Sequence, residues 1–243
     1  MYLHKSTVTI LSIVFTLISV LSISAQQSEP NGIDCPSGMF TTTFPAPPQG
    51  MANFRVVRLD ENCNLVEGPV LTVAVEALPP IALDQQERSI HFEPLFAGEV
   101  NAHQATMTRT YHTEQSIQDI VNITLNQLYS NITFDYNGHM ITSFNTSGGT
   151  SVHGENMPPS CGPGWNLANG FNAHIGGGAG MYSADFLQYG EFGYRGLFDC
   201  EGNIYYNQLS NHTSIYANGS ATCQFTQNYR TWSSLWHWTM ACY

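Results

Sequence analysis

The chain has 243 residues, with 18 acidic and seven basic side chains and a formal net charge of −11. Its single lysine, Lys5, lies near the start, and the remaining arginines offer no basic stripe. Proteins that bind nucleic acid need concentrated positive charge to neutralise phosphates. The composition therefore excludes nucleic acid as an expected partner.

Residues 1–25 have the pattern of an export signal. Lys5 precedes an apolar run over 6–23, and the small residue Ala25 suits the position before a cleavage site. The same run is about 18 residues long, which is enough to cross a bilayer if it is not cleaved. We therefore expect a signal peptide or an uncleaved anchor, a secreted or cell-surface protein, and no membrane span after signal removal.

The rest of the chain divides into two parts by composition. Residues 26–50 are rich in Pro, Gly and Thr and predict an extended tether, with a short edge strand over 39–44. Residues 51–243 predict a single β-rich domain, because one domain of this length is ordinary for all-β proteins.

The cysteines predict a covalent frame. All six follow the signal segment, and an even number in an exported chain indicates disulfides. Their order favours the pairs Cys35–Cys63, Cys161–Cys200 and Cys223–Cys242. No Cys-x-x-Cys occurs, which argues against a thiolate zinc site and thioredoxin-like chemistry.

The first half of the expected domain shows strand patterns and one ambiguity. Segments 53–59 and 65–76 flank a turn-forming cluster, which predicts a hairpin with Cys63 at its tip. The stretch 114–130 fits both a helical apolar face and a strand alternation. Its β-rich surroundings favour the strand.

The second half contains two hairpin signals. Asn137-Gly138 and Asn218-Gly219 each lie between alternating segments, and Asn-Gly is typical of a type I′ turn. The region 145–180 is dense in Gly and Asn and predicts a long irregular loop, which is often functional.

The C-terminal stretch 223–243 predicts a disulfide-closed hairpin. Folding it about its centre places Cys223 opposite Cys242, with one largely apolar face and one largely polar face. Together with the strand that precedes Asn218-Gly219, it predicts a three-stranded meander. Short alternating strands separated by turn residues predict an all-β fold, an antiparallel β-sandwich or open barrel reinforced by disulfides.

Catalytic and metal-binding motifs are sparse. The eight histidines after the signal are never two, three or four residues apart, so no local pair can chelate a metal, and we expect no metal and no cofactor. The acids of interest are Glu99, Asp185, Glu191 and Glu201. Glycoside hydrolysis needs two facing carboxylates about 5–9 Å apart, and Asp185 and Glu191 are the candidates for such a pair near one rim. Six residues apart along a strand, they share a face only if no turn intervenes, and Gly190 favours a bend between them.

A short segment resembles a known family. Phe186-Leu-Gln-Tyr-Gly190 is similar to the glutamine-bearing segment of secreted glutamic peptidases, β-sandwich enzymes that use a Gln–Glu pair. The resemblance covers five residues. In the later strand where the resemblance implies the partner glutamate, this chain has Asn207 instead.

The tryptophans indicate a binding function, because aromatic planes suit the apolar faces of pyranose rings. In the predicted hairpin, Trp236 and Trp238 share a side with Cys242 and are expected in the core. Trp165 and Trp232 fall in predicted loops and are the expected ligand-binding residues. No catalytic residue is expected.

The sequence thus favours a non-catalytic binding or structural protein of the cell exterior, with polysaccharide as the favoured ligand class and an extracellular glycan as partner. The alternative is a secreted, carboxylate-dependent hydrolase, either a glycosidase or a peptidase. The sequence leaves the oligomeric state open.

Overall fold

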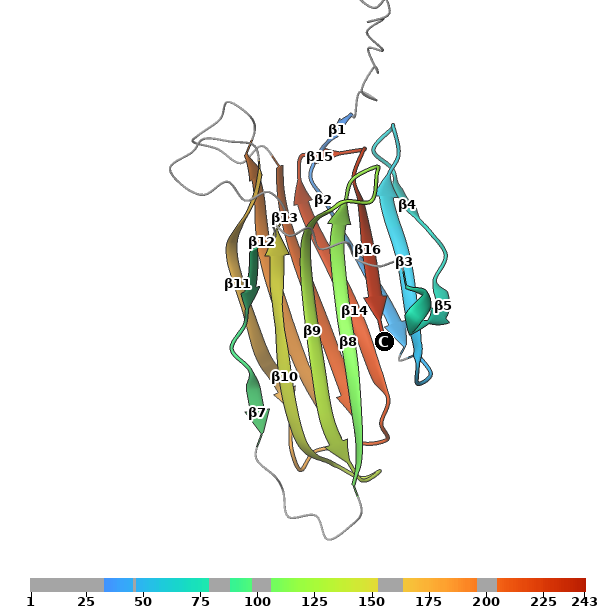
Figure 1. Ribbon diagram of the computed structural model, residues 1–243, viewed down its shortest axis with the longest axis vertical. Coiled ribbons are helices and arrows are strands. Elements are labelled where there is room, and N and C mark those ends of the chain that lie inside the picture. Colours follow the sequence, from blue (N-terminus) through green and yellow to red (C-terminus); the bar gives the residue numbers. More distant parts are fainter. Residues whose placement is uncertain (1–32, 46, 79–87, 98–105, 153–163, 196–204) are drawn as a thin grey trace, which may run out of the picture. The chain divides into compact units, whose positions relative to one another are not determined.

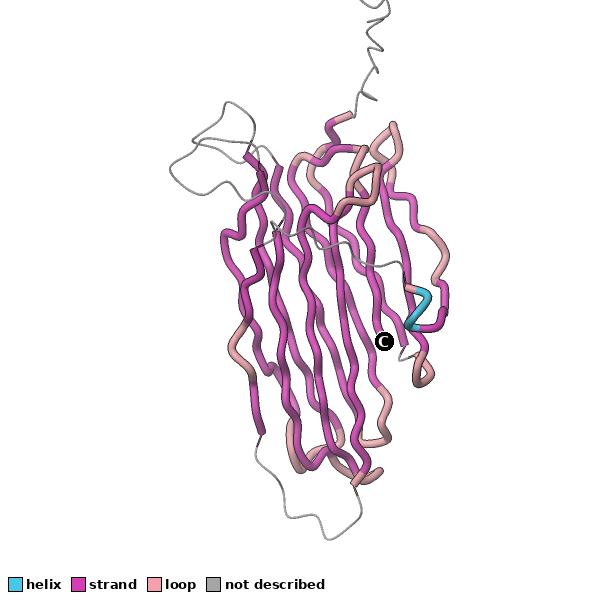
Figure 2. Tube along the Cα trace, viewed as in Figure 1, coloured by secondary structure: helices cyan, strands magenta, loops and turns pink. Residues whose placement is uncertain are grey.

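Two antiparallel sheets account for most of the chain. The computed structural model describes residues 33–45, 47–78, 88–97, 106–152, 164–195 and 205–243. Within these ranges nearly every regular element is a strand, and a single 3-10 turn, η1 (Val75–Ala77), is the exception (Figure 2). Within the described residues, no helix has the length and the apolar composition of a membrane-spanning segment.

The larger sheet has the order β4-β3-β16-β8-β9-β10-β6, with β5 added beside β3 and β7 beside β10 (Figure 1). Its strands are β3 (Met51–Leu59), β4 (Leu65–Glu67), β5 (Leu71–Ala74), β6 (Arg88–His91), β7 (Leu95–Ala97), β8 (Met107–Gln118), β9 (Thr124–Tyr136), β10 (Ile141–Val152) and β16 (His237–Cys242).

The smaller sheet has the order β11-β12-β13-β14-β2, and β1 pairs with β15 in a separate two-stranded sheet. The strands are β1 (Asp34–Cys35), β2 (Gly38–Pro45), β11 (Gly164–Gly177), β12 (Ser183–Arg195), β13 (Tyr205–Tyr216), β14 (Ala221–Arg230) and β15 (Trp232–Ser233). Residues 34–35 and 38–45, which the sequence places in a tether, are therefore strands of the folded unit, and β2 is the edge strand expected there.

The two sheets stack face to face and bury the alternating apolar side chains between them. On β14 and β13 the buried positions alternate mostly with partly buried ones, and on β2 they alternate with exposed ones. The core contains residues of both sheets, for example Phe40 and Phe225 from the smaller sheet and Ile117 and Trp238 from the larger one. The all-β sandwich prediction is confirmed. In 114–130 the strand is correct and the helix is wrong, but the stretch is the end of β8 and the start of β9, joined by a turn over 119–123.

The predicted C-terminal hairpin is wrong. β14 pairs with β13 and β2 in the smaller sheet, whereas β16 pairs with β3 and β8 in the larger sheet. The two strands face each other across the interior and do not lie side by side. Alternation requires only that each strand bury one face, so the same pattern fits both arrangements.

Two of the three predicted disulfides are present. Cys223–Cys242 joins β14 to β16 and therefore links the two sheets, and Cys35–Cys63 joins β1 to the turn after β3. The predicted pair Cys161–Cys200 lies outside the described residues. The hairpin with Cys63 at its tip is formed by β3 and β4.

Both Asn-Gly sites are hairpin turns, but neither is type I′. That turn needs positive φ at both central residues, and here only Gly138 (φ 89°) and Gly219 (φ 81°) have it. At the second turn, Gly219 N–H donates to the Tyr216 carbonyl (2.9 Å) and Tyr216 N–H to Ser220 (2.9 Å). This is the three-residue loop with a glycine at its left-handed position.

The predicted irregular loop over 145–180 is also wrong where the structure describes it. Most of these residues belong to β10 and β11. The glycines serve close backbone approach and not looseness: a Cβ on Gly149 would lie 2.2 Å from the Ile90 carbonyl oxygen of β6. Glycine within a strand is typical of such contacts.

A buried polar layer divides the sandwich interior into two apolar clusters. On β8, Thr113 and Gln115 separate Tyr111 of one cluster from Ile117 of the other, and Asn211 lies between the two clusters on β13. The amides form a relay between the sheets. Gln227 donates to Gln115, Gln115 donates to Asn211 (2.6 Å), and Asn211 donates to Thr113 (3.4 Å).

The inter-sheet disulfide predicts a stability effect. Replacing Cys223 and Cys242 by Ala together should lower the free energy of unfolding by about 3 kcal/mol, because the closed loop restricts the unfolded chain. Denaturant titration of the variant and the parent measures the difference. An unchanged midpoint would show that the sheets associate equally well without the covalent link.

The amide relay predicts a second effect. Gln115→Leu keeps the side-chain size but leaves Asn211 Oδ1 and Gln227 Nε2 buried without partners, so it should cost about 3 kcal/mol of unfolding free energy. The control is Gln49→Leu at an exposed turn position, with an expected change within about 0.5 kcal/mol. Equal midpoints for the two variants would refute a stabilising role for the relay.

Candidate functional site

A pocket opens where the β8–β9 turn approaches the loop before β16. Its volume is about 380 Å³, within the range of small-ligand sites, about 300–1,000 Å³. We call it the Trp236 pocket. It is lined by Val56, Arg58, Ile120, Asn122, Ser234, Leu235, Trp236 and His237.

The loop that carries Trp236 is fixed by β1. Asp34 pairs with Ser233 and Cys35 pairs with Trp232 in the two-stranded sheet. Ser234 and Ile33 add two reciprocal bonds, since Ile33 N–H donates to Ser234 Oγ (3.0 Å) and Ser234 N–H to the Ile33 carbonyl (3.0 Å). The chain then turns toward β16.

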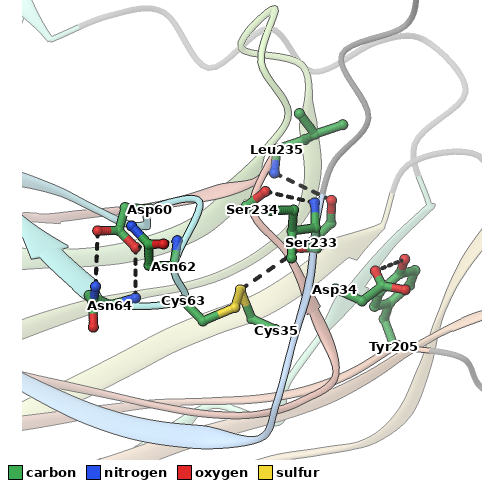
Figure 3. The surroundings of a disulfide bond; sticks show 11 residues. Asp34, Cys35, Asp60, Asn62, Cys63, Asn64, Tyr205, Ser233, Ser234 and Leu235 are labelled. Carbon is green, nitrogen blue, oxygen red and sulfur yellow. Dashed lines mark hydrogen bonds between the residues drawn. A yellow bond between two sulfur atoms is a disulfide. The ribbon is translucent and has the colours of Figure 1, made fainter.

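The Cys35–Cys63 disulfide anchors β1 to the β3–β4 turn (Figure 3). That turn is built around Asp60, whose carboxylate accepts the backbone N–H groups of Asn62 and Asn64 (both 2.8 Å). The hydrogen bonds from Asn64 hold the pKa of Asp60 below its ordinary value. One rigid turn therefore positions the loop that carries Trp236.

Aromatic contacts hold the Trp236 indole from behind. Its ring centroid lies 4.7 Å from Tyr205, 5.3 Å from Trp232 and 5.4 Å from Trp165. Tyr205 is itself fixed by a hydrogen bond to Asp34 (2.6 Å). Burial, and then this bond, raise the pKa of Tyr205 to about 12, so its hydroxyl stays protonated at neutral pH. The indole is half-buried and still borders the pocket.

The β8–β9 turn forms the opposite wall. Asp119 accepts the N–H groups of Val121 and Ile123 (both 2.9 Å), and Asn122 adopts a left-handed conformation (φ 63°). Asparagine tolerates that conformation better than most residues. The turn presents Asn122 to the pocket and leaves Ile120 exposed at its rim.

Two basic side chains contribute polar groups. Arg58 is exposed, and within the described residues no carboxylate forms an ion pair with it. His237 Nε2 lies 3.2 Å from Gln118 Oε1. Burial lowers the pKa of His237 and Arg58 lowers it further, whereas Asp119 acts in the opposite direction. The imidazole is thus neutral at pH 7, with Nε2–H donating to Gln118 and Nδ1 remaining as an acceptor.

The expected ligand-binding tryptophans lie elsewhere. Trp165 is 2% exposed on β11 and Trp232 is 0% exposed on β15, so both pack in the core and neither occupies a free loop. Trp238 is buried as expected, but Trp236, expected in the core, reaches a pocket. The sequence did not point to Arg58, Asn122 or His237, because three separate elements bring them together.

The two described acids of the hydrolase alternative, Asp185 and Glu191, do not converge. Asp185 and Glu191 lie on β12, which continues through Gly190 without a turn. Six residues of extended strand place them about 20 Å apart. The two carboxyl groups of a glycosidase are only about 5–9.5 Å apart. Asp185 instead accepts a hydrogen bond from Ser214 (2.5 Å), and Glu191 accepts one from Tyr189 (3.0 Å). Glu99 and Glu201 lie outside the described residues.

The segment that resembles glutamic peptidases faces the interior. Gln188 is 2% exposed and Asn207 is 0% exposed, and both lie between the sheets. Neither presents an amide to a surface that a substrate reaches. Among the described residues no group of three or more His, Cys, Asp or Glu side chains is placed to hold a metal ion.

Comparisons of the chain with protein-family models, with curated proteins and with solved structures find no match.

The lowered pKa of His237 predicts a pH dependence of stability. Below about pH 6.5 the unfolded chain binds a proton that the folded state resists, so this residue makes stability fall as the pH decreases. In the His237→Gln variant, stability should therefore decrease less between pH 7 and pH 5 than it does in the parent protein. Denaturant midpoints at pH 7 and pH 5 for both proteins measure it, and parallel declines would contradict the assignment.

Proposed function

We propose that the protein is an exported β-sandwich that binds a saccharide unit of an extracellular polysaccharide in the Trp236 pocket, without catalysing a reaction on it. The observation that carries the proposal is the position of Trp236: three of the four tryptophans are fully buried, and this one lines a pocket. The signal-like segment 1–25 and the two disulfides support the location outside the cell.

The residues around the indole suit a sugar. An aromatic ring packs against the apolar face of a pyranose, while a few placed polar groups recognise its hydroxyls. Arg58 supplies donors only, Asn122 and Ser234 supply both donors and acceptors, and the neutral His237 supplies Nδ1 as an acceptor, because its Nε2–H faces Gln118. The apolar side chains of Val56 and Leu235 complete the wall.

The carboxylate-dependent hydrolase is the weaker alternative. Asp185 and Glu191 are too far apart to act together, and the Trp236 pocket contains no carboxylate among its described lining residues. Binding therefore accounts for the residues that are present better than hydrolysis does.

The proposal predicts that Arg58→Ala and Trp236→Ala each weaken binding to a polysaccharide at least about tenfold, since each removes a contact of about 1.4 kcal/mol or more. A glycan array identifies the ligand for the parent protein, and titration calorimetry then compares the variants. Arg58 is exposed, so its variant tests binding without disturbing the core.

The matched control is Phe96→Ala. Phe96 is a 70% exposed aromatic on β7 and lies outside the pocket lining. Its variant should bind as the parent does. Equal loss in Phe96→Ala and Trp236→Ala, or no glycan bound by the parent protein, would contradict the proposed function.

A further inference from the structure

We propose that the first half of β8 is an acceptor edge for an extended peptide, which joins the larger sheet as an additional strand. The site is separate from the Trp236 pocket, and the inference does not depend on saccharide binding.

The inference starts from the backbone of β8. This strand pairs with β9 over its whole length, but with β16 only from Thr113 to Gln118. At the end of that pairing His112 and Tyr243 exchange both backbone hydrogen bonds (2.5 and 2.9 Å). Figure 1 shows β8 continuing well past the end of β16.

The alternation of antiparallel pairing then fixes where the next backbone groups point. Every second residue of a strand directs its N–H and C=O groups to the same neighbour. The backbone N–H and C=O groups of Thr108 and Thr110 therefore point in the same direction as those of His112, away from β9. Within the part of the chain that the structure describes, no strand pairs on that side with the residues of β8 that precede His112.

A pocket borders this unpaired edge. Its volume is about 370 Å³, and it is lined on the β8 side by Thr108, Arg109 and Thr110. Residues 47–51 and Val75 form the other wall, and Tyr136 and Tyr243 also border it. A peptide that continues the line of β16 would run through this pocket, antiparallel to β8.

Arg109 defines the chemistry of the peptide. Its guanidinium donates to the carbonyls of Gly219 (3.0 Å) and Pro47 (3.2 Å) and lies 4.8 Å from the centroid of the Tyr111 ring. Both acceptors are neutral, and none of the described carboxylates forms an ion pair with Arg109. A carboxylate on the incoming strand opposite Arg109 gains a charge-assisted hydrogen bond.

The net charge of the chain limits how acidic the peptide is. A formal charge of −11 repels a strongly acidic segment. The fitting occupant is thus a short extended peptide with one acidic side chain on its inner face. The residues two positions before and after that acid would be apolar and would face the interior. The residues directly before and after it would be polar and would lie beside Thr108 and Thr110.

The probe is the peptide acetyl-Val-Thr-Glu-Thr-Val-amide. Side-chain alternation places its glutamate opposite Arg109 and its two threonines opposite Thr110 and Thr108. In the full chain studied by NMR, the amide protons of Thr108 and Thr110 should exchange rapidly, and the peptide should slow both at least tenfold. The amides of Arg109 and Tyr111, which point toward β9, should not change.

Modified peptides test the backbone pairing without altering the protein. N-methylation of the two threonines removes the amides that pair with β8 and should weaken binding at least about tenfold, whereas N-methylation of the last valine should not. Replacing the peptide glutamate by glutamine should also weaken binding, and Arg109→Gln should remove the difference between these two peptides.

Three outcomes would overturn the inference. The amides of Thr108 and Thr110 are already protected in the free protein, the unmodified peptide leaves their exchange unchanged, or the threonine-methylated peptide binds as tightly as the parent peptide.

Discussion

The disulfide between Cys223 and Cys242 is the constraint that fixes the two described sheets to each other. It joins strands of opposite sheets, and the chain between them leaves the smaller sheet, pairs briefly with β1 and enters the larger sheet. This short connection carries Trp232, Ser234, Leu235 and Trp236. The connection from β14 to β16 therefore supplies side chains both to the core at one end of the sandwich and to the pocket beside it.

The interior gains specificity from groups that are costly to bury. Asn126 and Asn207 are fully buried, and neither side-chain amide has a partner among the described protein groups. The relay from Gln227 through Gln115 to Asn211 pairs the side-chain amides of Gln115 and Asn211 and the Nε2 of Gln227. Because these bonds cross between the sheets, a shift of one sheet over the other would break them. Apolar side chains alone would tolerate a shift of one sheet over the other far better.

Much of the fold follows from the sequence, and the failures have physical causes. Alternation revealed the strands, and cysteine order revealed both disulfides that the structure describes. Alternation does not distinguish strands that pair edge to edge from strands that face each other, so the pattern of 223–243 predicts a hairpin where the structure has strands of opposite sheets. The glycines of 145–180 suggested a loop, although Gly149 is there because the backbone of β6 passes too close for a side chain.

The candidate site was harder to predict than the fold. Trp165 and Trp232 looked free because they fall near glycine or in a turn, yet the aromatic cluster buries them. Arg58, Asn122 and His237 become neighbours only after β3, the β8–β9 turn and β16 are assembled. Sequence spacing contains no signal for such a meeting.

The stacking of Trp232 on Trp238 has a practical consequence. Their ring centroids are 4.2 Å apart with an interplanar angle of 12°, and one indole belongs to β15 and the other to β16. Electronic transitions of indoles this close couple to each other, and where their in-plane directions differ the coupling gives a paired band of opposite signs in circular dichroism. The molecule thus contains its own spectroscopic marker for the crossing between the sheets, which is readable without any attached label.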